Sequence, residues 1–171
     1  CISSAASDVY KRQDLVRWMI ELAAGDLPPL HELAAGLNPQ GHAIQARLYA
    51  EDPGKQFQPS PGLLTEVVFP ATEDHRLRID TWVTAGCEIP PFFDPMLAKI
   101  IAYEPTREQA MVGLERALAN TRLYGVEHNR DYLRQILAAE PFANGQPWTR
   151  CLDALTYKAT TCEVIGAGTQ T

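Results

Sequence analysis

Positive charge is scarce in this sequence of 171 residues. There are 15 Lys and Arg residues against 21 Asp and Glu residues, which gives a formal net charge of -6. Broad nucleic-acid binding is not expected, because no basic stripe is present to displace counterions from phosphates. Long apolar runs are also missing, since none approaches the roughly 20 residues needed to cross a bilayer. These absences argue against membrane insertion and leave small ligands, nucleotides included, as candidate partners.

Cysteine is rare and shows no pattern. The four cysteines form no CxxC pair and have no regular spacing, so neither a zinc site nor a disulfide framework is indicated. A reducing cytoplasm is the location we expect from this usage. The four histidines contain no HExxH spacing, and we expect no metal site from these residues alone. Glycine-rich phosphate loops of the GxGxxG and Walker types are missing as well.

The most informative stretch that is present covers residues 41–53 and reads GHAIQARLYAEDP. Apolar residues alternate with polar ones here, which predicts a strand with one buried face and one polar face. Arg47 lies at the centre of the polar face, where a rigid strand would hold its guanidinium ready to bind an anion or to stabilise developing negative charge. The alternative is a solvated arginine on an exposed sheet face.

The rest of the chain predicts an α+β fold, with an antiparallel β-sheet and packed helices. Further strands are expected at residues 63–69, 77–83 and 96–103. One helix should begin at Asp14, with a stripe containing Trp18 and Met19 in the core. A second helix is expected over residues 106–119, a third beginning at Asn129, and a short one over residues 148–155.

Four blocks of sequence resemble the C-terminal domain of biotin carboxylases, in the order and spacing of that family. They are GHAIQARLYAEDP, FQPSPG, PPFFDPMLAKI and YGVEHN, at residues 41–53, 57–62, 90–100 and 124–129. The resemblance implies a biotin carboxylase C-terminal domain-like fold over residues 41–155.

The resemblance also suggests how the remaining residues are divided. Residues 14–40 correspond to the end of an ATP-grasp domain and a linker. Residues 1–13 include DVYKRQ, which resembles the translation of a transposon end used in DNA sequencing, and we expect them to be an adapter artefact. Residues 156–171 are expected to be a linker into a carboxyltransferase region, because EVIGAGTQT resembles that entry in urea carboxylases, including the carboxylase part of urea amidolyase.

In this family ATP, with magnesium or manganese, activates bicarbonate, and biotin on a carrier domain is carboxylated at N1. The resemblance places Arg47 at the biotin ureido oxygen, where negative charge develops, and Asp94 beside the active site. It places Thr149 and Arg150 near the adenine pocket, and Arg78 at a homodimer contact. Simpler readings are open for two of these residues: Asp94 could cap a turn, and Arg78 could face solvent.

Several alternatives follow from the same residues. Gln45 stands where the family more often has glutamate, which removes a negative charge from the face of Arg47. The complete enzyme could be a urea carboxylase, with urea or guanidine as acceptor, or the biotin carboxylase subunit of an acyl-CoA carboxylase. A different class is a non-catalytic module for dimerisation or carrier docking. We expect these residues alone to be inactive, because the phosphate loop and the metal-binding glutamates of the family have no counterpart in them.

Overall fold

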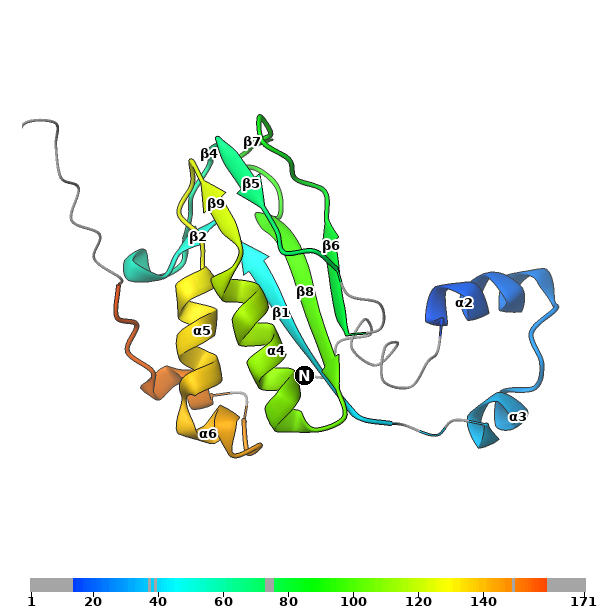
Figure 1. Ribbon diagram of the computed structural model, residues 1–171. Helices are drawn as coiled ribbons and strands as arrows, with labels where there is room; N and C mark the ends of the chain where they lie inside the picture. The colour runs from blue at the N-terminus through cyan, green and yellow to red at the C-terminus, as the bar shows by residue number, and fades with distance from the viewer. Residues whose placement is uncertain (1–13, 37, 39, 73–75, 149, 160–171) are drawn as a thin grey trace, which may run out of the picture.

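The computed structural model describes residues 14–36, 38, 40–72, 76–148 and 150–159 (Figure 1). The expected adapter, Thr149 and the EVIGAGTQT block lie outside the described residues. The fold is α+β with antiparallel strand pairs and helices, which confirms the predicted class.

The central sheet has three antiparallel strands, in the order β1 (His42–Tyr49), β8 (Met96–Glu104) and β6 (Leu77–Thr81). Its register places side chains in rows across the three strands. Ala46 lies opposite Ile100, which lies opposite Ile79, and this row faces the core. Because side chains alternate along a strand, the neighbouring row, which contains Arg47, faces the other way.

Two helices cover the apolar face of this sheet, α4 (Arg107–Ala119) and α5 (Arg130–Ala138) (Figure 1). Thr106 begins α4 by accepting a hydrogen bond from the backbone N–H of Gln109 at 3.3 Å. The stripe predicted for this helix is buried as expected; it consists of Ala110, Leu114, Ala117 and Leu118. The core therefore lies between the helix pair and the sheet, and the opposite sheet face carries the polar side chains.

The single strand predicted over residues 63–69 is wrong, because the chain changes partner within it. β4 (Gly62–Leu63) pairs with β7 (Glu88–Ile89), whereas β5 (Glu66–Val68) pairs with β9 (Arg122–Tyr124). At the break, Leu64 is fully buried and its N–H bonds the carbonyl of Cys87, while the N–H of Thr65 bonds the carbonyl of Tyr124. The residues from 63 to 69 all favour a strand, but pairing with β7 at one end and with β9 at the other divides them into two short strands.

A shorter ladder follows the end of β1. β2 (Glu51–Asp52) pairs with β3 (Gln58–Pro59), and the 3₁₀ turn η1 (Pro53–Lys55) joins them. The Asp52 side chain accepts from the N–H of Gly54 at 2.8 Å, which fixes the start of this turn. The EDP sequence thus closes β1 with a local turn.

Near the N-terminus, α2 (Leu15–Ala24) and α3 (Leu30–Ala35) lie apart from the sheet (Figure 1). Asp14 caps α2 by accepting from the N–H of Arg17 at 2.9 Å, and Gly25 ends the helix with φ 80°. The helix was predicted correctly, but its stripe is not core: α2 has no buried residue, and Met19 is 69% exposed. Capping and periodicity are local signals, whereas burial requires a partner surface, and the described part of the chain places none there.

The C-terminal part packs along α5. A short helix, α6 (Glu140–Ala143), is followed by the 3₁₀ turn η2 (Cys151–Ala154), which replaces the longer helix predicted over residues 148–155. The Gln135 side chain then bonds both the N–H and the carbonyl of Lys158, at 3.0 and 2.7 Å. Among the described residues, no helix has the length and apolarity needed to span a bilayer.

Candidate functional site

Arg47 is an exposed cation on a fixed strand. Its neighbours in sequence, Ala46 and Leu48, are 5% and 0% exposed and belong to the hydrophobic core, so the backbone on either side is held by packing. Among the described residues, no hydrogen-bond acceptor or carboxylate is within bonding distance of its guanidinium. A planar group with five donors therefore remains available for an anion.

The polar sheet face carries further charges in register with Arg47. Lys99 on β8 lies between Arg47 on β1 and Asp80 on β6. Arg78, the predicted dimer contact, donates from Nε to Asp80 Oδ1 at 2.8 Å, and its side chain is 50% exposed. Gln45 lies in the same row as Arg78, across the buried Ile101. The face is thus predominantly cationic around Arg47, with Asp80 drawn toward Arg78.

Asp94 lies in the exposed loop that leads into β8. Its Oδ1 accepts a hydrogen bond from the N–H of Met96 at 3.0 Å, which is the turn-capping arrangement considered for it above. Next to this loop, the carbonyl of Pro95 accepts from the N–H of Ala50 at 2.9 Å, which joins the loop to the end of β1. A role for Asp94 beside an active site stays a prediction.

Glu51 was not selected from the sequence, although it follows β1 directly. Partial burial raises the pKa of its carboxyl group above the ordinary value of 4.5, and the negative charge of Asp94 raises it further. The charge of Asp94 therefore acts on the Glu51 carboxyl group at the end of β1. Alternation along residues 41–53 places Glu51 on the polar face, which was the only available signal.

Arg150, expected near an adenine pocket, is engaged locally. Its Nε donates to Asp153 Oδ2 at 2.7 Å within the turn η2, and its side chain is 84% exposed. Thr149, which the resemblance places near the same pocket, lies outside the described residues. Among the residues that are described, no group of three or more His, Cys, Asp or Glu side chains is arranged to hold a metal ion.

The sequence of residues 45–154, which includes Arg47 and the strands around it, matches the family profile described as Biotin carboxylase C-terminal domain. The chain belongs to this family.

Two relatives show which biotin carboxylases the chain resembles. It is 43% identical over 158 residues to a urea amidolyase of Lachancea kluyveri, covering 92% of this chain and 8% of that protein. The crystal structure of Kluyveromyces lactis urea carboxylase superposes with a TM-score of 0.84 at 39% identity, covering 92% of this chain and 14% of that one. The chain therefore spans only a small part of the length of these relatives.

A third structure is a biotin carboxylase domain dimer of the Hydrogenobacter thermophilus 2-oxoglutarate carboxylase, in complex with MgADP, ADP and bicarbonate. It superposes with a TM-score of 0.80 at 28% identity, covering 90% of this chain and 33% of that one. That relative is thus a dimer whose biotin carboxylase domain binds the nucleotide and bicarbonate.

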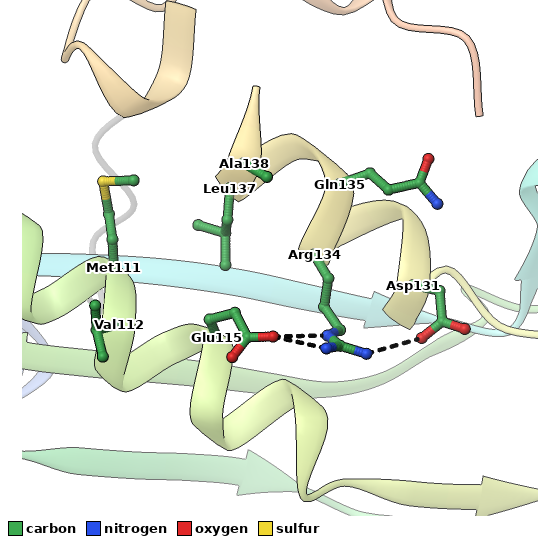
Figure 2. Close-up of a pocket in the computed structure, with 8 residues that line it drawn as sticks. All are labelled: Met111, Val112, Glu115, Asp131, Arg134, Gln135, Leu137 and Ala138. Atoms are coloured by element: carbon green, nitrogen blue, oxygen red, sulfur yellow. Dashed lines mark hydrogen bonds and ion pairs between the residues drawn. The ribbon is translucent and has the colours of Figure 1, made fainter. Parts of the chain in front are cut away.

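The biotin carboxylase C-terminal domain also has a groove on its helix side, between α4 and α5, with a volume of about 460 Å³. Figure 2 shows Arg134 of α5 between two carboxylates, and it donates to Glu115 Oε1 of α4 at 2.7 and 3.0 Å. Asp131 lies 3.9 Å from the same guanidinium. Because α4 and α5 cover the core face of the sheet, this groove lies on the opposite side from Arg47, and its charges join the two helices to each other.

Proposed function

We propose that this domain forms one wall of the active site of an ATP-dependent biotin carboxylase of the urea carboxylase type, with Arg47 facing the ureido oxygen of biotin. The observation that carries the proposal is the unpaired guanidinium of Arg47 on a strand whose other face is buried in the core. Membership of the biotin carboxylase C-terminal domain family supports it. The 43% identity to a urea amidolyase supports the subfamily.

The chemistry asked of Arg47 is electrostatic. When bound, biotin would supply a ureido group whose N1 loses its proton and is carboxylated, and negative charge would develop on the ureido oxygen. A cation that is already held in place interacts more strongly with that oxygen as the charge grows, and this difference lowers the barrier. Because β1 is fixed by Ala46 and Leu48, the guanidinium need not be reorganised during the reaction.

Other parts of the complete enzyme would hold the phosphates of ATP, magnesium or manganese, and bicarbonate. The described residues offer no metal-ligand cluster, so we assign none of them to the metal. Within the proposal, residues 14–40 complete an ATP-grasp domain, residues 41–155 form this domain, and residues 156–171 lead to a carboxyltransferase region. A biotinylated carrier domain, a homodimer contact at Arg78, and a cytoplasmic location complete the proposal.

The test uses a chimaeric carboxylase, because the chain covers only 14% of the K. lactis enzyme. Residues 14–155 would replace the matching segment of that enzyme, and two rates would be measured: bicarbonate-dependent ATP cleavage and carboxylation of free biotin. Arg47→Ala should lower biotin carboxylation by about 100- to 1000-fold while ATP cleavage is largely kept. The isolated chain, assayed in parallel, should show no ATP cleavage.

A matched control is Arg122→Ala. Arg122 is an exposed strand arginine that pairs with Glu66 at 3.1 Å, and its loss should change neither rate. If Arg47→Ala behaves like this control in a folded chimaera, Arg47 is a surface residue and the proposal fails.

A non-catalytic docking module is the second candidate, and one observation favours it. Phe92 and Phe93, next to Asp94, are 85% and 78% exposed, which is unusual for adjacent phenylalanines. The docking module is favoured if Arg47→Ala leaves carboxylation of free biotin unchanged.

The final carboxyl acceptor is tested with the complete native enzyme. ATP cleavage is measured with urea, guanidine and an acyl-CoA in turn, and the acceptor is the compound that stimulates it.

A further inference from the structure

The edge of β1 next to Arg47 is closed by one residue from a distant segment. β1 is an outer strand of the three-stranded sheet, so the backbone groups on its far side have no ladder partner in that sheet. Asn129, which is 82 residues from Arg47 in sequence, lies at this edge. It is 7% exposed, which is low for an asparagine.

Three hydrogen bonds join Asn129 to β1. Its Nδ2 donates to the carbonyl of Arg47 at 3.2 Å, and its Oδ1 accepts from the N–H of Tyr49 at 3.0 Å. Its backbone N–H donates to the carbonyl of Tyr49 at 3.2 Å. The amide orientation follows from its partners, because a carbonyl can only accept and a backbone N–H can only donate. One residue thus supplies the donor and acceptor that a neighbouring strand would supply.

These bonds lie where the β1–β8 ladder is irregular. Leu48 pairs with Ala98, but Tyr49 pairs with Met96, so one residue of β8 is left over between them. Such a bulge bends and loosens a ladder locally. The irregularity begins one residue after Arg47, so the Asn129 amide bridges it from the free edge of the strand.

The side chain of Asn129 is not used for its expected purpose. Asn129 occupies the N-cap position of α5, as predicted, but its side chain makes no capping hydrogen bond. A capping side chain contributes about 1 kcal/mol to a helix. The side-chain amide of Asn129 forms its hydrogen bonds with β1 and none with its own helix. This arrangement points to a role for Asn129 at β1.

We propose that Asn129 is a positioning residue for Arg47, holding the strand backbone so that the guanidinium is presented at a fixed place and angle. The inference rests on the proposed function of Arg47. Asn129 contacts the backbone of Arg47 and not its guanidinium, so it acts through Arg47 alone. Loss of the Asn129 side chain should therefore lower the rate of biotin carboxylation, which needs Arg47, and leave bicarbonate-dependent ATP cleavage largely unchanged.

The first experiment compares Asn129→Ala with Asn120→Ala in the chimaeric carboxylase. Asn120 is a matched control, because its Nδ2 also donates to a backbone carbonyl, that of Arg116 at 2.9 Å, at the far end of α4. Asn129→Ala should lower carboxylation of free biotin by about 10- to 100-fold, as expected for a displacement near 1 Å, with ATP cleavage changed less than about threefold. Asn120→Ala should change neither rate. Equal losses of both rates in Asn129→Ala would show a role in the fold alone and overturn the proposal.

A second variant, Asn129→Asp, targets the bond to Arg47, because it places a carboxylate oxygen against the Arg47 carbonyl in place of the donor. It keeps the size of the side chain and the acceptor for Tyr49, but it removes the donor to the Arg47 carbonyl. Carboxylation of biotin should fall by a similar factor, and full activity would overturn the proposal. This variant also carries the test if Asn129→Ala does not fold.

A double-mutant cycle then separates the two proposals. If Asn129 acts through Arg47, adding Asn129→Ala to Arg47→Ala should cost less than about a further twofold, because coupled residues are not additive. A further loss as large as in the wild-type background would mean that Asn129 acts independently, and would overturn the inference. If Arg47→Ala lowers carboxylation but Asn129→Ala does not, only the role of Asn129 fails; if Arg47→Ala changes nothing, the proposed function fails with it.

Discussion

Gly125 provides the sharpest test of the packing described above. It follows β9 directly, with φ at 109°, and it crosses the segment between β4 and β5. A Cβ placed on Gly125 would overlap the carbonyl oxygen of Leu63 and lie 3.0 Å from both the Leu63 carbonyl carbon and the Thr65 nitrogen. All three atoms are backbone, so a side-chain rotation cannot relieve the contact.

The expected magnitude for Gly125→Ala follows from two terms. A non-glycine residue in the left-handed region costs about 1–2 kcal/mol. Relieving the overlap must also separate the segments and weaken the 2.8 Å bond from the Thr65 N–H to the Tyr124 carbonyl, and losing a hydrogen bond of this kind adds roughly 0.5–1.5 kcal/mol. We expect a total loss of about 2–3 kcal/mol in the free energy of unfolding.

Gly86→Ala is the matched control, because Gly86 has a similar φ of 91° but no heavy atom lies within 4 Å of its added Cβ. It should cost only the backbone term, about 1–2 kcal/mol. Urea unfolding of the chain, followed by circular dichroism, gives both values. Equal losses for the two variants would refute the argument, since they would show that the contact with Leu63 is absorbed without cost.

Two further predictions concern ionisable groups. Burial lowers the pKa of His128 below its ordinary value of 6.5, so its neutral form favours the folded state and stability should fall as the pH drops below about 6.5. The melting temperature of His128→Gln should therefore vary less between about pH 7.5 and 5.5 than that of the wild type, and an equal variation would contradict this prediction. Asp94→Asn should lower the raised pKa of the Glu51 carboxyl group, because it removes the negative charge that adds to the effect of burial. NMR titration of the Glu51 side-chain carbonyl measures this pKa, and an unchanged value would show that burial alone raises it.

The elements that the sequence predicted well are those specified by local patterns. Alternation over residues 41–53 predicted β1 and the outward direction of Arg47, because a strand with one buried face has a period of two. Thr106 and the stripe from Ala110 to Leu118 predicted α4 for the same kind of reason, with a helical period. Such patterns determine which face of an element is buried once a core exists.

The features that the sequence did not predict depend on contacts between distant segments. The break at Leu64 arises because β7 and β9 approach the same stretch from different parts of the chain. The apolar stripe of α2 was correctly read as a helix face, but periodicity does not say what will cover it. Asn129 matched the preference for N-caps, and only the fold shows that its amide bonds β1 instead.

The same loop connects the stability of Gly125 to the placement of Arg47. Between Gly125 and Asn129, the backbone N–H of Glu127 donates to Ser60 Oγ at 3.0 Å. This short loop is therefore held in the middle by that bond, at its start by the β5–β9 pairing that ends at Tyr124, and at its end by Asn129. Four residues can span at most about 14 Å when fully extended, which leaves little slack between three anchors. A displacement forced at Gly125 should therefore reach Asn129 and the edge of β1. In a chimaera that remains folded, Gly125→Ala should then lower biotin carboxylation more than ATP cleavage, whereas Gly86→Ala should leave their ratio unchanged.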